Sequence, residues 1–180
     1  IVGGPWFRFR SHRQPRRVVW QFVPAFGALF LIVAWLPFHT PASGSLDVWF
    51  LDVGQGDAIL IRSPDGRAVL LDAGPDRMGP YLPDMLRERG VARLEAAIAS
   101  HADADHIGAL AETLEVIPCN RLIVSGLGAS TTDFREVEEV VRDKGIDVFQ
   151  ARRGAEMILG SDGVSLTFLH PVEEFVTAGA

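Results

Sequence analysis

Four potential metal ligands fall within six residues of the chain. They are His101, Asp103, Asp105 and His106, in the run that begins at Ser100. Imidazole nitrogens and carboxylate oxygens are the side-chain groups with which proteins bind the divalent metal ions used in hydrolysis. A solvated turn with helix-capping aspartates would explain one of these residues, but hardly all four together. The residue types and their spacing therefore predict a metal centre.

The cluster follows an apolar segment, residues 94–99, that is typical of a buried β-strand. A helix is expected directly after it, over residues 107–114. A strand end followed by a tight loop and a helix start can turn several side chains toward one point. Upstream, three strands and one hairpin turn are expected, at residues 46–53, 58–62 and 68–72, with the turn at 63–66.

The rest of the chain predicts alternating helices and strands. A helix is expected at residues 81–89, and a second one at 131–144 that Gly145 ends. Further strands are expected at residues 121–125, 147–150, 156–159 and 164–169. Opening hairpins followed by this alternation predict an α/β fold, with helices on an outer face of the sheet.

Charge is distributed unevenly along the 180 residues. Residues 1–40 contain five arginines and no acidic residue, whereas residues 41–180 contain 12 basic and all 23 acidic residues, for a net charge of −6. An acidic body argues against broad binding to duplex DNA, which needs clustered lysines and arginines. Cys119 is the single cysteine, so an intrachain disulfide is excluded.

Residues 18–38 predict a transmembrane helix. The segment carries no charge, and 21 residues in a helix would span about 32 Å, enough to cross the hydrocarbon core. The basic flank, residues 1–17, is expected in the cytoplasm by the positive-inside rule. A linker at residues 39–45 would then lead to a domain at 46–180 on the outer side. A cleaved signal peptide is the alternative, since it also joins a basic head to an apolar core.

The His/Asp cluster resembles the HxHxDH signature of the metallo-β-lactamase superfamily. Together with residues 51–59 (LDVGQGDAI) and 70–74 (LLDAG), it resembles the C-terminal domain of ComEC-like DNA-internalisation competence proteins. The resemblance implies a four-layered αβ/βα sandwich, preceded by one transmembrane helix, with the metal site at one edge. This chain would supply mainly the N-terminal half of the sandwich, and further Asp and His ligands are expected after Ala180.

The resemblance also implies roles for the cluster. His101 with Asp103 would bind one metal ion, and Asp105 with His106 a second. Asp105 would in addition orient the attacking water, which makes it the candidate catalytic residue. The superfamily most often has His at the position of Asp103. An oxygen ligand there favours Mn²⁺ or Mg²⁺ over Zn²⁺, although Zn²⁺ stays open.

Two further aspartates are expected near the site. The resemblance implies that Asp72 supports the centre by accepting a hydrogen bond from a ligand histidine; a turn-capping role is the alternative. Asp57 either lines the edge of the site or stabilises its hairpin. Gly54 and Gly56 are interpreted as tight-turn residues. His170 is expected at an ordinary strand exit, with a metal-ligand role as the weaker alternative.

These features favour an extracytoplasmic, metal-dependent hydrolase domain of a DNA-uptake channel in the bacterial cell membrane. It would be a nuclease that cuts phosphodiester bonds of incoming DNA. The expected partners are single-stranded DNA, the lipid bilayer and the channel-forming remainder of the same polypeptide. Residues 1–180 alone are expected to be inactive. Two alternatives stay open, namely another secreted or anchored hydrolase of the superfamily and a degenerate, non-catalytic domain that binds DNA or a partner.

Overall fold

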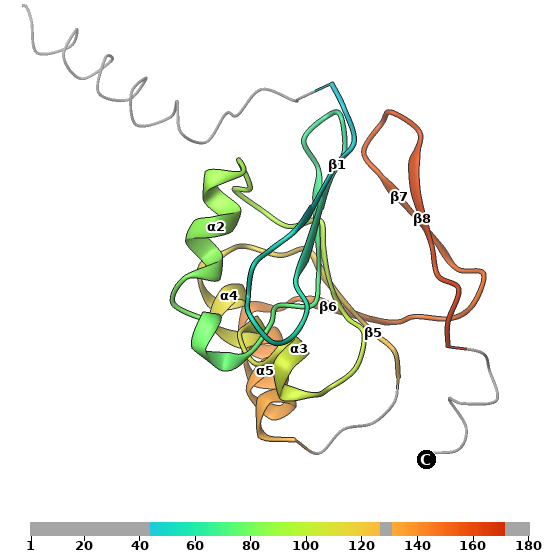
Figure 1. Ribbon diagram of the computed structural model, residues 1–180. Helices are drawn as coiled ribbons and strands as arrows, with labels where there is room; N and C mark the ends of the chain where they lie inside the picture. The colour runs from blue at the N-terminus through green and yellow to red at the C-terminus, as the bar shows by residue number, and fades with distance from the viewer. Residues whose placement is uncertain (1–43, 127–130, 172–180) are drawn as a thin grey trace, which may run out of the picture. The chain divides into compact units, whose positions relative to one another are not determined.

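The structure contains a six-stranded sheet and a two-stranded sheet (Figure 1). It is a computed structural model that describes residues 44–126 and 131–171. The strands of the larger sheet follow chain order from one edge to the other. They are β1 (Asp47–Phe50), β2 (Ile59–Arg62), β3 (Ala68–Leu71), β4 (Ala96–Ala99), β5 (Arg121–Val124) and β6 (Asp147–Gln150). The smaller sheet consists of β7 (Glu156–Leu159) and β8 (Val164–Thr167).

The first three strands form the antiparallel hairpins that the sequence predicts. Val48 pairs with Ile61, which in turn pairs with Val69, so apolar side chains at alternate positions share one face. The turn between β2 and β3 closes with a hydrogen bond from Ser63 N–H to the Arg67 carbonyl at 2.8 Å. This tight turn fixes the register of the hairpin.

Strands β3 to β6 are parallel, and helices connect them. The helical elements are η3 (Asp76–Met78, 3₁₀), α2 (Leu82–Glu88), α3 (Ala104–Ile107), α4 (Leu110–Val116) and α5 (Thr132–Lys144). In a parallel arrangement the carboxyl ends of the strands meet at one edge of the sheet. The loops that leave β3 and β4 therefore begin side by side.

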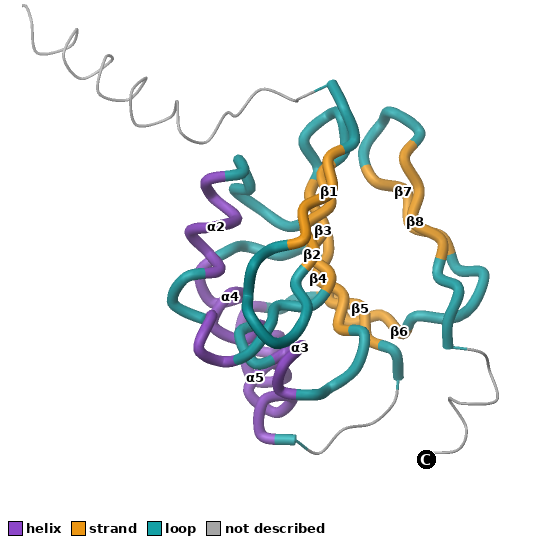
Figure 2. Tube along the Cα trace, viewed as in Figure 1, coloured by secondary structure: helices purple, strands orange, loops and turns teal. Residues whose placement is uncertain are grey.

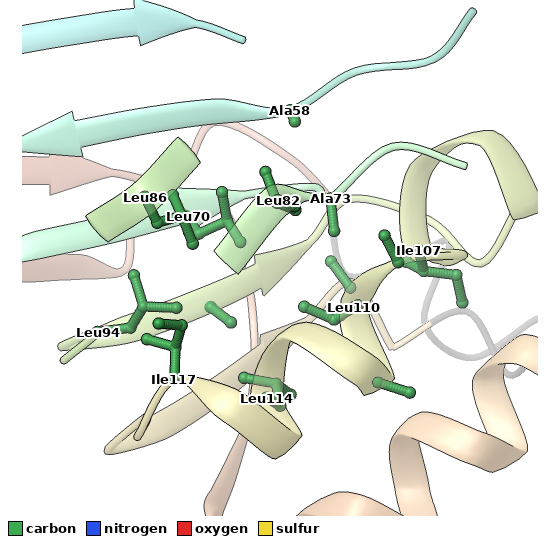
Figure 3. Packing of buried hydrophobic residues seen from close by; sticks show 14 of the residues in the cluster. Ala58, Leu70, Ala73, Leu82, Leu86, Leu94, Ile107, Leu110, Leu114 and Ile117 are labelled. Atoms are coloured by element: carbon green, nitrogen blue, oxygen red, sulfur yellow. The ribbon is translucent and has the colours of Figure 1, made fainter. Parts of the chain in front are cut away.

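The helices lie on one face of the larger sheet, whereas β7 and β8 lie on the opposite side (Figure 2). The main core fills the space between sheet and helices (Figure 3). Leu70 and Leu94 from the sheet side, with Leu110 and Leu114 from α4, are at most 2% exposed. Truncation of such a leucine to alanine costs about 2–5 kcal/mol, so this layer holds the site-bearing loops in place.

A second, smaller core lies on the other face of the sheet. Val69, Ile98 and Ile123 pack there with Met157 and Leu159 of β7. All four residues of β4 are buried, because one face meets the helices and the other meets the β7–β8 hairpin. Burial on both faces explains why this strand is a continuous apolar run rather than an alternating one.

On this second face of the sheet, the side chains of β1 remain partly exposed to solvent. Trp49 packs against the main core, whereas its neighbours Val48 and Phe50 point to the opposite face and are 48% and 80% exposed.

The expected helix at residues 107–114 is wrong in its extent. The chain forms two short helices there, α3 and α4, that join at Gly108 and Ala109. A Cβ atom at Gly108 would overlap the backbone of Pro75–Asp76 and the Ala104 carbonyl. The glycine thus permits a close approach of α3 to the loop after β3, and the chain bends at this contact.

The long helix α5 begins and ends where its sequence predicts. Thr131 is the N-cap, and its hydroxyl accepts a hydrogen bond from Phe134 N–H at 3.2 Å. Gly145 ends the helix in the left-handed conformation, with φ of 64°.

The basic flank (1–17), the transmembrane helix (18–38) and most of the linker (39–45) were predicted for residues that lie outside the described ranges. Across residues 44–126 and 131–171, none of the helices has the length and apolar character needed to span a bilayer.

Candidate metal centre

The candidate centre lies at the carboxyl edge of the larger sheet. Asp72 directly follows β3, His101 follows β4, and His106 lies in α3. Two backbone hydrogen bonds hold these segments together: Asp72 N–H donates to the Ile98 carbonyl at 2.9 Å, and Ala73 N–H donates to the His106 carbonyl at 2.7 Å. Crevices outside the carboxyl ends of parallel strands are the usual ligand sites of open α/β sheets.

Asp72 is the buried anchor of the centre, with its side chain 5% exposed. Its Oδ1 accepts a hydrogen bond from Ser100 N–H at 2.8 Å, and its Oδ2 accepts one from Ser100 Oγ at 2.5 Å. Oδ2 also lies 3.0 Å from His106 Nδ1. The backbone of Asp72 is left-handed, with φ of 55°, a conformation that aspartate tolerates better than most residues. The backbone N–H and hydroxyl of Ser100 and a ring nitrogen of His106 therefore converge on one carboxylate.

The two histidine rings lie against each other, with centroids 3.9 Å apart and planes inclined by 50°. His106 is mostly buried, at 16% exposed, while His101 is 40% exposed. His101 Nδ1 lies 2.9 Å from Ser100 Oγ, and its Nε2 lies 3.5 Å from Asp103 Oδ2.

One ligand atom each from Asp72, His101 and His106 lies within 4.8 Å of the other two. These three residues form a group that could hold a metal ion. Two imidazole nitrogens and one carboxylate oxygen are a donor set that suits Zn²⁺ and other first-row divalent ions. The chemistry of the residues present thus fits a divalent metal ion.

The aspartates predicted as direct ligands lie at the rim. Asp103 is the N-cap of α3 and its side chain is 74% exposed. Asp105 lies in the first turn of α3 and is partly exposed. Neither belongs to the three-residue group found among the described residues. Asp57 Oδ2 lies 3.8 Å from His106 Nδ1, at the edge of the centre, and its side chain is 66% exposed.

Glycines in the loop between β1 and β2 allow Asp57 to lie close to α3. Gly56 has φ of 115°, and a Cβ atom there would overlap the backbone carbonyl of Asp105. Gly74 N–H donates to the Asp57 carbonyl at 2.8 Å, which ties this loop to the segment after β3. The tight-turn interpretation of Gly54 and Gly56 agrees with their positive φ angles, and Gly56 additionally permits a close contact.

Sequence reasoning missed Ser100 as a member of the centre. Its hydroxyl lies between the carboxylate of Asp72 and the ring of His101. A hydroxyl residue directly before the first histidine was the available signal. Ser100 also lines an apolar cavity of about 320 Å³ between the larger sheet and β8 with the segment that follows it, and His170 lines the same cavity. Within the described residues, His170 is not part of the metal-capable group.

Three comparisons bear on this centre. The model of the metallo-beta-lactamase superfamily matches residues 51–176. The chain is 28% identical over 146 residues to ComE operon protein 3 of Bacillus subtilis (strain 168), and 34% identical over 104 residues to Recombination protein 2 of Haemophilus influenzae (strain ATCC 51907 / DSM 11121 / KW20 / Rd). These matches cover 71% and 55% of this chain, but 19% and 13% of the relatives. The chain thus spans under a fifth of either relative.

A solved metallo-beta-lactamase from Hirschia baltica is similar at 15% identity, with a TM-score of 0.36. That similarity covers 62% of this chain and 57% of the solved one.

Proposed function

The chain belongs to the metallo-beta-lactamase superfamily and is related to ComE operon protein 3 and Recombination protein 2, and we propose that it is a metal-dependent hydrolase domain that cuts phosphodiester bonds of DNA during uptake. The observation that carries the proposal is the convergence of His101, His106 and Asp72 at the carboxyl edge of the sheet. The relation to Recombination protein 2 and the resemblance to ComEC-like DNA-internalisation proteins support DNA as the substrate class.

His101 and His106 would hold the metal, with Asp72 beside them. A bound divalent ion would supply Lewis-acid chemistry, by polarising a phosphoryl oxygen and making a water molecule acidic enough to attack at neutral pH. We further propose Asp103 and Asp105 as ligands from the rim, by analogy with the superfamily signature. Their oxygens favour Mn²⁺ or Mg²⁺. The expected number of bound ions is two.

The protein side chains have separate tasks in this proposal. Asp72 accepts a hydrogen bond from His106 Nδ1 and so keeps that ring oriented. Asp105, which lies in the first turn of α3, would orient the attacking water. Asp57, on the loop facing His106, limits the open side of the centre. Burial of Asp72 keeps water from competing for its hydrogen bonds.

We propose a single strand, rather than duplex DNA, as the substrate. The acidic balance of residues 41–180 gives no broad basic surface for duplex binding. Bound cations would offset part of the negative charge at the centre itself. We propose that residues 18–38 anchor the domain in the bacterial membrane, with residues 46–180 on the outer side beside a channel formed by the same polypeptide.

The test is cleavage of DNA by the full-length protein, because residues 1–180 alone are expected to be inactive and span under a fifth of either relative. Single- and double-stranded substrates are incubated with Mn²⁺, Mg²⁺ or Zn²⁺, in parallel with a His101→Ala/Asp105→Ala double variant. We expect metal-dependent cleavage of the single strand that the double variant loses. Metal binding without cleavage of any DNA would reject the nuclease proposal and favour another substrate of the superfamily.

The exposed position of Asp103 favours one further candidate, a domain that binds DNA or a partner without catalysis. A folded chain that binds DNA but binds no metal ion would support this alternative.

A further inference from the structure

Four polar groups form a continuous hydrogen-bonded chain behind the two histidine rings. His101 Nδ1 lies 2.9 Å from Ser100 Oγ, and Ser100 Oγ lies 2.5 Å from Asp72 Oδ2. The same carboxylate oxygen lies 3.0 Å from His106 Nδ1. One buried carboxylate is thus in contact with one imidazole directly and with the other through a single hydroxyl.

The chemistry of these groups fixes the direction of each hydrogen bond. A carboxylate accepts only, so the hydroxyl proton of Ser100 is donated to Asp72. The Ser100 oxygen then has only lone pairs left for His101, and Nδ1 of that ring must be the donor. His106 Nδ1 must likewise donate to Asp72. A neutral imidazole carries one proton, so both rings then present an unprotonated Nε2.

We infer that Ser100 is a positioning residue that, together with Asp72, fixes the tautomer of His101 so that its Nε2 is free to bind the metal. The inference deepens the proposed function and rests on its metal centre. Metal-bound histidines commonly donate the other ring N–H to an oxygen that sets tautomer and orientation. Here the carboxylate of Asp72 contacts the ring of His106 directly, and it contacts the ring of His101 through the hydroxyl of Ser100.

A competing contact shows why the hydroxyl matters. Asp103 Oδ2 lies 3.5 Å from Nε2 of His101. Without an acceptor at Nδ1, the ring proton would be attracted to Nε2 by this carboxylate, and the nitrogen needed for the metal would be blocked. Ser100 gives the proton a partner on the opposite side of the ring.

The first test reads the tautomer directly in the metal-free full chain. Histidine is labelled with ¹⁵N, and two-bond ¹H–¹⁵N correlation spectra are recorded at mildly alkaline pH. We expect an Nδ1-protonated His101 in the wild type and in Ser100→Thr, which keeps the hydroxyl. Ser100→Ala is expected to move the ring toward the Nε2-protonated form. A wild-type ring protonated at Nε2, or a tautomer unchanged in Ser100→Ala, would overturn the inference.

The second test measures Zn²⁺ affinity by calorimetry on the same proteins. Loss of such a supporting partner is expected to weaken binding about 10–100-fold in Ser100→Ala, and Ser100→Thr should restore it. Ser125→Ala is the matched control, because Ser125 follows β5 as Ser100 follows β4, and wild-type affinity is expected. Equal affinity in wild type and Ser100→Ala would contradict the inference. A wild type that binds neither Zn²⁺ nor Mn²⁺ rejects the proposed function, while the tautomer spectra still decide the role of Ser100.

Discussion

Replacement of Asp72 by asparagine tests how far one buried carboxylate organises the centre. Asparagine has almost the same shape and also tolerates the left-handed backbone at this position, so the change acts on the side chain alone. An amide offers one acceptor oxygen and one donor nitrogen. Three donors face the carboxylate now, namely the N–H and hydroxyl of Ser100 and Nδ1 of His106.

The magnitude follows from this mismatch. The amide oxygen can remain with Ser100 N–H, but the amide nitrogen then faces His106 Nδ1. His106 can accept from the amide only if its proton moves to Nε2, where it blocks metal binding. Leaving a buried donor without a partner costs about 1–3 kcal/mol, so we expect the free energy of unfolding to fall by that amount. Metal affinity should fall about 10–100-fold.

The assay combines urea unfolding, followed by circular dichroism, with Zn²⁺ calorimetry on the full chain. Asp84→Asn is the matched control, because Asp84 is 73% exposed and forms a surface ion pair with Arg87 at 3.0 Å. That control should change the free energy of unfolding by less than about 0.5 kcal/mol and leave Zn²⁺ affinity unchanged. An Asp72→Asn chain with wild-type stability and wild-type Zn²⁺ affinity would refute the role given to the carboxylate.

Two further predictions concern the loops around the centre. Gly56→Ala should lower the free energy of unfolding by about 1–3 kcal/mol more than Gly66→Ala. Both glycines have positive φ, but only a Cβ atom at Gly56 would overlap the backbone of α3. Equal losses of stability in urea unfolding would contradict the close contact at Gly56. The pKa of Asp65 is lowered from 3.8 to about 2, because the Ser63 hydroxyl and then Ser161 N–H donate to its carboxylate. Its contribution to stability is therefore complete above the unfolded value of 3.8 and is lost as pH falls through about 2. An acid titration of the unfolding free energy should show this dependence in the wild type and not in Asp65→Asn, and identical titrations would count against it.

The strands and the long helix could be predicted because their signals are local. Turn residues and alternating apolar positions mark the β1–β2–β3 hairpins. Thr131 and Gly145 bracket α5 with an N-cap and a left-handed end. The division of the 107–114 helix was missed, since it depends on the approach of Gly108 to Pro75, which is distant in the sequence.

The centre was predictable in part for the same reason. His101 and His106 stand in one recognisable run, and their rings do meet. Asp72 was expected as a supporting residue, which stays a prediction; the structure places its carboxylate 3.0 Å from His106 Nδ1 and within the three-residue group that could hold a metal ion. Its place there arises from the parallel pairing of β3 with β4, which brings a strand end 28 residues away in sequence to Ser100. Sequence spacing alone cannot reveal such a contact.

The most direct measurement is a Mn²⁺ titration of the full chain followed by electron paramagnetic resonance, because the proposed hydrolysis requires a bound ion. Wild-type protein should bind Mn²⁺, and His101→Ala and His106→Ala should each lose most of that binding. His170→Ala should bind as the wild type does. A folded wild type that leaves all Mn²⁺ free, or binding that survives both histidine changes at the centre, would contradict the assignment of a metal centre to His101 and His106.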